Sequence, residues 1–212
     1  MPDLPSTVVV IDDDPSVREA VGTLLRSVGL QVRLLSAVDE FLKLGRPPGT
    51  ACLVLDVRLP GRSGLDFQRD LLAANIRLPI IFITGHGDIP MSVQAMRGGA
   101  IEFLTKPFRD QDLLDAIQQG LARDRDSIAE DRELAVLRAR FELLTARERE
   151  VMAHVVTGRL NKQIAGDLGV SEVTVKVHRG QVMQKMRAKS VVELARMADR
   201  LSANTGPKFT SS

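Results

Sequence analysis

The sequence predicts two domains of different class. The first is a doubly wound α/β domain with a five-stranded parallel sheet, and a long helical linker joins it to an all-α, four-helix helix-turn-helix domain. In the first 121 residues, short apolar runs alternate five times with amphipathic helical patterns, which indicates parallel strands with helices on both faces. The last third contains only helical patterns, and the short turn LGVS joins two of them.

The composition of the 212 residues predicts a soluble protein without a membrane partner. Hydrophobic residues make up 44% of the chain, yet no apolar run approaches the roughly 18 residues of a membrane span. No charged-then-apolar leader opens the chain, so we expect a cytoplasmic location. The single cysteine, Cys52, lies in a predicted buried strand, which favours an apolar filler over a reactive thiol.

Charge is divided unevenly along the chain. Residues 145–212 hold 12 Lys and Arg against 6 Asp and Glu, whereas residues 1–144 hold 17 against 21. A basic last third behind an acidic front predicts a polyanionic partner such as double-stranded DNA.

The elements of the first domain follow from apolar runs and from helix end signals. Asp14 is expected to cap a helix with Pro15 at its first position, and Ser36 to cap a short helix that runs to Leu44. Pro60, Gly61 and Gly64 predict a loop after the third strand. The expected strands are 8–11, 30–35, 51–55, 78–83 and 100–104, and the expected helices are 15–28, 37–44, 65–74, 90–98 and one from 111.

One long helix is expected to leave the first domain near Leu121 and to continue to about Phe141. Charges of both signs replace the apolar spacing there without Gly or Pro, which predicts a stiff, solvated helix rather than a flexible linker. The boundaries that follow are 7–121 for the α/β domain, 122–140 for the linker, 141–206 for the helix-turn-helix domain and 207–212 for a disordered tail.

The helices of the last third are predicted from their caps. Thr145 with Glu148, and Ser190 with Glu193, have the spacing of capping boxes. Helical structure is expected to end near Leu201, with disorder from Ser202 on. The two helices on either side of the LGVS turn are expected to be capped by Asn161 and by Ser171.

Polar side chains follow four of the predicted strands where they end. Asp12 and Asp13 follow the first, Asp56 the third, Thr84 the fourth and Lys106 the fifth. On its own segment, Asp56 is explained equally well as a cap of the strand or turn. Because ligands of open parallel sheets bind outside the carboxyl ends of the strands, the set as a whole predicts one shared site.

The chemistry of this set favours Mg²⁺ and phosphate. Three crowded carboxylates are costly to ionise unless a divalent cation lies among them. Mg²⁺ prefers such hard oxygen ligands and bridges carboxylate to phosphate. Asp56 could then attack phosphorus as a carboxylate nucleophile, with Lys106 and the metal offsetting the charge of the transferring group. His86 lies near the site but has no companion ligand, so we do not expect it to bind metal.

Several motifs carry a family resemblance over nearly the whole chain. DDD after the first strand, LDVRLPGRSGL around the third, ITGHGD after the fourth and EFLTKPF around the fifth resemble a receiver domain, with its flavodoxin- and CheY-like fold. LTAREREVM and NKQIAGDLGVSEVTVKVHRGQVMQKM resemble a LuxR-type helix-turn-helix. The combination is similar to two-component response regulators of the FixJ/NarL family, and most similar to FixJ.

This resemblance implies a role for each residue of the site. Asp56 is the implied phosphate acceptor. Mg²⁺ is implied to bind Asp12, Asp13, Asp56 and the backbone carbonyl of Arg58. Thr84 and Lys106 are implied to contact the phosphoryl oxygens, with Phe103 as the switch aromatic. Many receivers have Asn where this chain has Arg58 and Ala where it has Gly85, so the lifetime of the phosphorylated form could differ.

The resemblance also implies the partners. A cognate histidine kinase supplies the phosphoryl group, since the donor histidine must belong to another protein. Phosphorylation then promotes a homodimer that binds specific DNA, and RNA polymerase is a further partner that this role allows. The implied protein controls transcription and is not an enzyme.

Residues 172–187 are expected to form the recognition helix. Val175 and Val177 point apart on a helix, so one of them is free to face DNA. The family places Lys176, Val177 and the position of Gly180 near base edges. NarL-like members have Lys at that last position, so readout there is lost or passes to Arg179. The expected phosphate contacts are Lys162, Lys185 and Lys189, for which the alternative is plain solvation.

Two rival functions remain at this point. An Mg²⁺-dependent phosphohydrolase with a C-terminal interaction module would need a second acid or base carboxylate near the nucleophile, but Val57 and Arg58 follow Asp56. A receiver that ignores phosphorylation is disfavoured by the intact Asp56, Thr84 and Lys106.

Overall fold

The computed structural model describes residues 6–203. The expected tail, 207–212, therefore lies outside the described residues. Contacts divide the chain into two compact units, one ending at Ile128 and the other beginning at Ala129. Each unit is described by itself.

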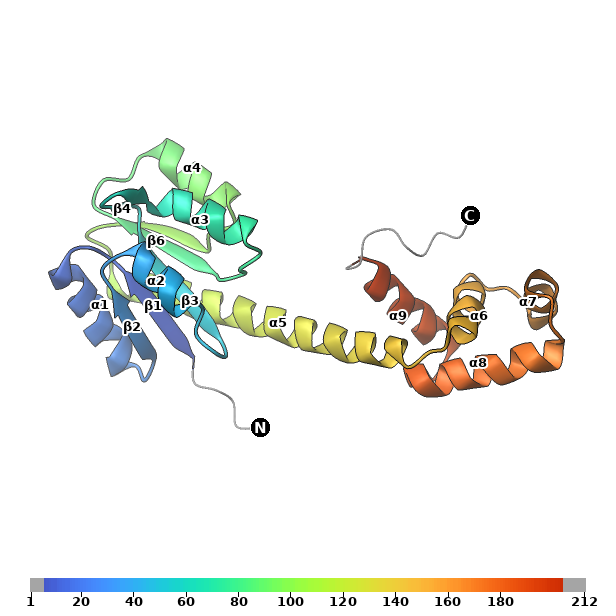
Figure 1. Cartoon of the computed structure of the whole chain (residues 1–212). Coiled ribbons are helices and arrows are strands. Elements are labelled where there is room, and N and C mark those ends of the chain that lie inside the picture. The colour runs from blue at the N-terminus through green and yellow to red at the C-terminus, as the bar shows by residue number, and fades with distance from the viewer. Residues whose placement is uncertain (1–5, 204–212) are drawn as a thin grey trace. The chain divides into compact units, whose positions relative to one another are not determined.

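The first unit is built on a parallel sheet of five strands within the described residues, in the order β2-β1-β3-β6-β7 (Figure 1). Every neighbouring pair in it is parallel, which confirms the predicted doubly wound sheet. Its strands are β1 (Thr7–Ile11), β2 (Gln31–Leu35), β3 (Ala51–Asp56), β6 (Ile80–Thr84) and β7 (Glu102–Thr105).

Helices cover both faces of this sheet because alternate strand residues point to opposite sides. Val9, Leu53 and Phe82 pack in one cluster with α2 (Val38–Leu44), α3 (Gly64–Ala73) and α4 (Ile89–Arg97). Val10 and Val54 pack in the other cluster with α1 (Pro15–Ser27) and α5 (Asp110–Glu142). Cys52 is buried in this second cluster, as the sequence predicted for an apolar filler. Burial also raises the pKa of its thiol.

Two local predictions in the first unit are wrong. The N-cap of α2 is Ala37 rather than Ser36, because the Glu40 carboxylate accepts hydrogen bonds from the Ser36 N–H and hydroxyl one residue earlier. The loop predicted after Asp56 contains an antiparallel pair, β4 (Arg58–Leu59) with β5 (Arg62–Ser63). Gly61 has φ +79° in the turn between them, a conformation that favours glycine.

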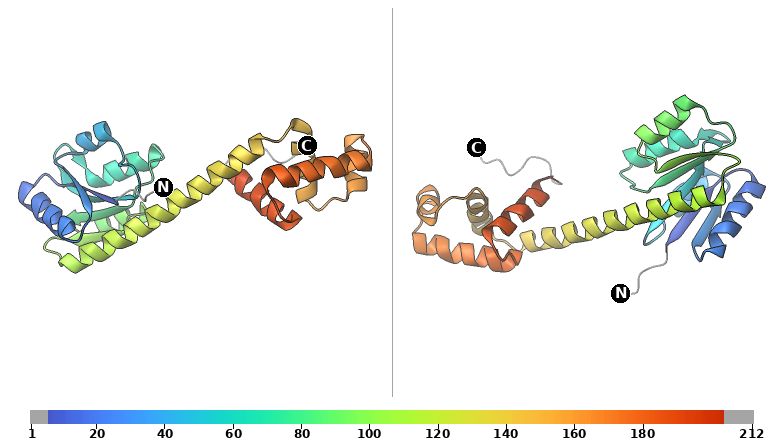
Figure 2. Two further views of the ribbon diagram at one scale, coloured as in Figure 1. Left: turned by 90° about the horizontal axis from the view of Figure 1, so that it is seen from below. Right: turned by 180° about the vertical axis from the view of Figure 1, so that it is seen from behind.

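The predicted long helix is confirmed as one continuous element, α5, of 33 residues (Figure 2). Its packing against the first unit continues past Leu121, because the Asp124 side chain is only 2% exposed. The Oδ2 atom of Asp124 accepts hydrogen bonds of 2.7 Å from Arg46 Nη2 and from the Ala51 N–H at the start of β3.

The second unit packs the end of α5 with four helices. Leu134 and Leu137 of α5 belong to its core. The Thr145 and Glu148 capping box and the Ser171 cap are confirmed. The helices are α6 (Ala146–Val156), α7 (Asn161–Leu168), α8 (Glu172–Met186) and α9 (Val191–Ala203).

Three predicted helix ends in this unit need correction. Asn161 is the first helical residue of α7 and Leu160 is its N-cap, because Gln163 Oε1 accepts the Leu160 N–H. Ser190 accepts the Glu193 N–H as predicted, but Glu193 pairs with the Lys189 N–H instead of that of Ser190. Helix α9 includes Ser202, where disorder was expected.

Across residues 6–203, none of the helices is both long enough and apolar enough to traverse a lipid bilayer.

Candidate functional site

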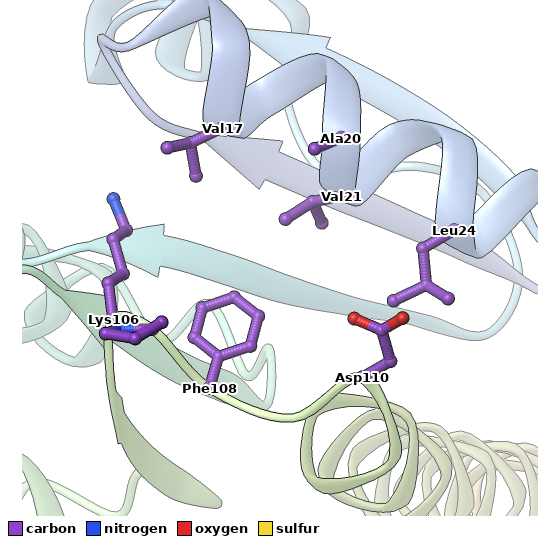
Figure 3. A pocket seen from close by; sticks show the side chains of 8 residues that line it. Val17, Ala20, Val21, Leu24, Lys106, Phe108 and Asp110 are labelled. Carbon is purple, nitrogen blue, oxygen red and sulfur yellow. The ribbon is translucent and has the colours of Figure 1, made fainter.

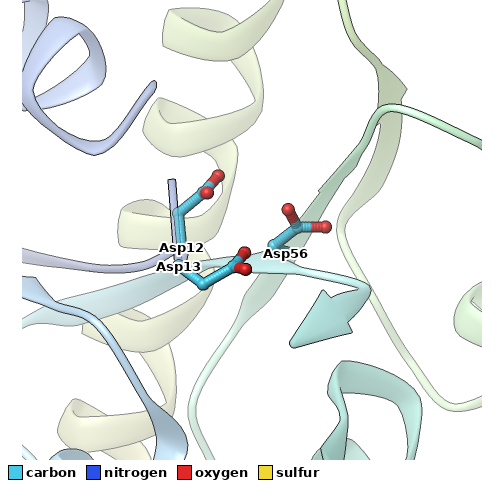
Figure 4. Close-up of side chains that lie close together, drawn as sticks. All are labelled: Asp12, Asp13 and Asp56. Carbon is cyan, nitrogen blue, oxygen red and sulfur yellow. The ribbon is translucent and has the colours of Figure 1, made fainter. Parts of the chain in front are cut away.

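An acidic group lies at the carboxyl end of the sheet. Carboxylate oxygens of Asp12, Asp13 and Asp56 all lie within 4.8 Å of one another (Figure 4). The pairing of β1 with β3 aligns Ile11 with Leu55. The next residue of each segment, Asp12 or Asp56, therefore lies at the same end of the sheet. The predicted convergence of these three side chains is therefore present.

Lys106 joins the two buried carboxylates of this group. Its Nζ donates hydrogen bonds to Asp12 Oδ2 at 2.6 Å and to Asp56 Oδ2 at 2.8 Å. The remaining oxygens are bound by backbone, since Asp12 Oδ1 accepts the Asp14 N–H and Asp56 Oδ1 accepts the Arg58 N–H, each at 3.0 Å. Both buried carboxylates are thus held by hydrogen bonds, whereas Asp13 is exposed.

The pKa shifts follow from burial and from this pairing. Burial raises the pKa of Asp12, and the hydrogen bond from Lys106 offsets only part of that effect. Burial alone would lower the pKa of Lys106, but its hydrogen bonds to Asp12 and Asp56 outweigh burial and raise it. Lys106 is therefore a cation at neutral pH.

The donor set fits a hard divalent cation. Three carboxylates offer oxygens to one point, which is the ligand type that Mg²⁺ prefers. Of Arg58, the contact present is its N–H to Asp56, and the role of its carbonyl stays a prediction. His86 is not part of any potential metal-binding group within residues 6–203.

Thr84 and Phe103 lie on the neighbouring strands β6 and β7. Thr84 is fully buried, and its Oγ1 accepts the His86 N–H at 3.3 Å. Phe103 is half-buried, and its ring centroid lies 6.3 Å from that of Phe82. Phe103 pairs directly with Phe82 across the two strands, and Thr84 pairs with Thr105.

Gly64 supports the position of Asp56 in a way that the sequence analysis missed. A Cβ on Gly64 would lie 2.4 Å from the backbone oxygen of Asp56. Its N–H also donates to the Val57 carbonyl at 2.9 Å. Any side chain at position 64 would therefore displace the end of β3. The glycine was visible in the motif, but its contact depends on the return of the chain through β4 and β5.

An apolar pocket of about 600 Å³ lies beside Lys106 (Figure 3). Val17, Val21 and Leu24 of α1 line one side of it, and Phe108 lines the other. The pocket is mainly apolar, so it differs in chemistry from the acidic group.

Helix α8 divides its valines as predicted. Val175 and Val182 are fully buried, whereas Val177 is 57% exposed. Lys176 and Gly180 are exposed as well. These three exposed positions are available to a ligand of α8, and so are the exposed Lys162 and Lys189.

Two cations of α8 are already paired within the unit. Lys185 Nζ donates to both carboxylate oxygens of Glu148, so it cannot reach a DNA phosphate without leaving a buried carboxylate. Lys185 thus differs from the solvated or phosphate-bound lysine expected from the sequence. Arg179 Nη1 donates to Asn161 Oδ1 at 3.0 Å, which ties α8 to the first residue of α7.

Two family models match the chain. One, described as the response regulator receiver domain, matches residues 8–118. The other, described as bacterial regulatory proteins of the luxR family, matches residues 142–198. Together they cover the α/β domain and the helix-turn-helix domain.

Curated relatives match over most of their length. Nodulation protein W of Bradyrhizobium diazoefficiens is 54% identical over 199 residues, which cover 93% of this chain and 88% of that protein. Transcriptional regulatory protein FixJ of Rhizobium meliloti is 40% identical over 201 residues, which cover 95% of this chain and 98% of that protein.

Solved structures match as well. Response regulator StyR has a TM-score of 0.82 and 48% identity, and the match covers 93% of this chain and all of that one. The beryllofluoride-activated NtrC4 receiver domain dimer has a TM-score of 0.50 and 29% identity, over 55% of this chain and 97% of that one.

Proposed function

Because this chain belongs to the two-component response regulators with a receiver domain and a luxR-type DNA-binding domain, we propose that phosphorylation of Asp56 by a histidine kinase controls its binding to DNA. Members of this family are transcriptional regulators rather than enzymes, which removes the phosphohydrolase alternative. The observation that carries the proposal is Asp56 at the end of β3, within hydrogen-bonding distance of Lys106 and close to Asp12 and Asp13.

The proposed transfer uses one oxygen of Asp56 as the nucleophile. It forms an O–P bond while the N–P bond of the donor phosphohistidine breaks, and the electron pair of that bond leaves with the imidazole. Lys106 offsets negative charge on the phosphoryl oxygens. Mg²⁺, held by Asp12, Asp13, Asp56 and the carbonyl of Arg58, would supply further charge neutralisation there. The Thr84 hydroxyl donates to a phosphoryl oxygen of the product.

The proposed response is dimerisation. The phosphoryl group draws Thr84 away from the His86 N–H, and Phe103 moves into the space that Thr84 leaves. This repacks the face formed by α4, β7 and α5. Ile89, Val93 and Met96 are exposed apolar residues of α4, and the activated NtrC4 receiver is a dimer. Helix α9 is the second proposed dimer surface.

The proposed DNA contacts lie on and around α8. Lys176, Val177, Arg179 and Gly180 face the bases, and Lys162 and Lys189 contact phosphates. The partners are thus a cognate kinase, double-stranded DNA and a second copy of the chain, with RNA polymerase as a further partner. We propose a cytoplasmic location for a protein with these partners.

Gel-shift binding to genomic fragments, with and without acetyl phosphate and Mg²⁺, tests this function. We expect the phosphodonor to increase binding of the wild-type chain and to leave the Asp56→Asn chain unchanged. Equal binding by the wild-type chain in both conditions would contradict the proposal.

A further inference from the structure

Gly87, in the loop between β6 and α4, lies against both residues of the proposed switch. A Cβ placed on Gly87 would be 2.8 Å from Phe103 Cε1 and 3.1 Å from the methyl carbons of Thr84 and Thr105. Real Cβ contacts are essentially never as short as the first of these distances. The ring of Phe103 therefore occupies space that is open only because residue 87 has no side chain.

This glycine is required for space and not for backbone conformation. The φ angle of Gly87 lies outside the left-handed region, so an alanine would fit its backbone. Gly85 in the same loop also lies outside that region, but a Cβ there would meet nothing within 4 Å apart from its two chain neighbours, Thr84 and His86. The two glycines thus differ in that only a Cβ at position 87 would meet the ring of Phe103.

The position of this space gives it a function. Its walls include the Thr84 methyl group and the Phe103 ring, and Phe82 lies on another side of that ring. When Thr84 turns from the His86 N–H toward a phosphoryl group, its methyl group must move as well, and so one wall of the space changes. Phe103 can follow only if no side chain at position 87 stands in its way.

We infer that Gly87 is a positioning residue that lets Phe103 respond to Thr84, so that phosphorylation at Asp56 is converted into dimerisation. The inference rests on the proposed function. It assigns to Gly87 no contact with Asp56 or with the phosphoryl group, because its close neighbours belong to β6 and β7. A side chain at position 87 should therefore leave phosphorylation of Asp56 intact and weaken the dimerisation that follows it in the wild-type chain.

The test compares Gly87→Ala with the matched control Gly85→Ala in the full chain. Intact mass after treatment with acetyl phosphate and Mg²⁺ measures phosphorylation, and sedimentation velocity measures dimerisation. We expect Gly87→Ala to be phosphorylated as the wild-type chain is, but to dimerise with an association constant lower by about tenfold or more, or about 1.4 kcal/mol. Because the residue at position 85 could alter the lifetime of the phosphorylated form, dimerisation is compared at equal phosphorylated fraction, and there Gly85→Ala should match the wild-type chain.

Aromatic NMR spectra of the unphosphorylated chains give a readout that does not depend on phosphorylation. The chain has 7 Phe and no Trp or Tyr, so its ring signals are few. Phe103→Leu identifies the signals of Phe103. They should shift in Gly87→Ala and remain in place in Gly85→Ala.

The outcomes separate this inference from the proposed function. If the wild-type chain is neither phosphorylated nor dimerised, the proposed function fails. If the wild-type chain responds and Gly87→Ala dimerises equally well, the inference is overturned. Loss of phosphorylation in Gly87→Ala, dimerisation of that variant without phosphodonor, or unshifted Phe103 signals would each overturn it as well.

Discussion

Lys185 Nζ on α8 lies 2.8 and 2.6 Å from the two carboxylate oxygens of Glu148 on α6. Glu148 is buried, and its Oε2 also accepts the N–H of Thr145, the N-cap residue of α6. This carboxylate therefore connects α8 to the N-cap of α6. Burial alone would raise the pKa of Glu148, but the hydrogen bonds from Lys185 and Thr145 outweigh burial and lower it.

A lowered pKa gives the pair a defined pH dependence. Its contribution to stability is fully present above the ordinary pKa of glutamate and is lost as pH falls through the lower value of the folded state. We expect Glu148→Gln, which can still accept the Thr145 N–H, to lower the free energy of unfolding by about 2 kcal/mol at neutral pH. The difference from the wild-type chain should shrink below about pH 4.

Urea unfolding followed by far-UV circular dichroism at several pH values measures this difference. The matched control is Glu150→Gln, because Glu150 pairs with Arg147 at an exposed position of the same helix. Glu150→Gln should change the free energy of unfolding by no more than about 0.5 kcal/mol. Equal effects of the two variants would show that the Lys185 pair contributes nothing beyond an ordinary surface pair.

The Arg46 and Asp124 pair should anchor α5 to the start of β3. Arg46→Ala leaves the buried Asp124 with only the Ala51 N–H, so we expect a loss of about 3 kcal/mol in the free energy of unfolding. Arg26→Ala is the control, because Arg26 and Glu19 form an exposed pair at 3.8 Å. A loss no greater than that of Arg26→Ala in urea unfolding would refute the anchor.

Mg²⁺ should stabilise the first unit through the acidic group. At 100 times its Kd, a bound ion adds about 2.7 kcal/mol to the free energy of unfolding, which thermal unfolding with and without MgCl₂ detects. Asp13→Asn should abolish that gain, because it removes one of the three carboxylates. Without Mg²⁺ the variant should be as stable as the wild-type chain, because Asp13 is exposed and has no hydrogen bond from Lys106 to lose. Asp39→Asn, at an exposed position of α2, should retain it. Equal thermal stability of the wild-type chain with and without MgCl₂ would contradict the metal assignment.

Lys176 and Lys189 should affect DNA binding differently. Lys176 lies in the first turns of α8, which we propose to reach base edges. Lys176→Ala should therefore relax the base preference at a symmetric pair of positions in the DNA site, with a loss of about 1 to 3 kcal/mol in discrimination. Lys189 lies past the end of α8, so Lys189→Ala should weaken binding to all DNA sequences alike. It should also reduce the slope of log binding constant against log salt concentration by about 1 per monomer. Binding-site selection compares the two variants. An unchanged motif with Lys176→Ala would mean that another face of α8 reads DNA.

The acidic site could be predicted from the sequence because parallel strands bring their carboxyl ends to one edge. That single rule places Asp12, Asp56 and Lys106 together although Lys106 is 94 residues from Asp12. The pairing of Lys185 with Glu148, 37 residues apart, follows from no such rule. It depends on how α6 packs against α8, which hydrophobic spacing does not specify.

The local errors arise from contacts that a capping preference does not specify. Glu40 accepts the N–H of Ser36 itself, and the helix is capped one residue later, whereas Gln163 accepts the N–H of Leu160, one residue before Asn161. Strands β4 and β5 are two residues each, too short to show an alternating pattern. The closeness of Gly87, in the loop after β6, to Phe103 of β7 depends on how two separate segments pack, so no sequence pattern marks it.

Intact mass of the full chain after treatment with acetyl phosphate and Mg²⁺ tests the central assignment, Asp56 as the phosphate acceptor, most directly. Asp56→Asn removes the nucleophilic charge at nearly constant volume and leaves an oxygen for the Arg58 N–H, so the fold should persist. We predict that the wild-type chain gains the mass of one phosphoryl group and that Asp56→Asn gains none. The same mass gain in Asp56→Asn, or no gain in the wild-type chain, would contradict the assignment.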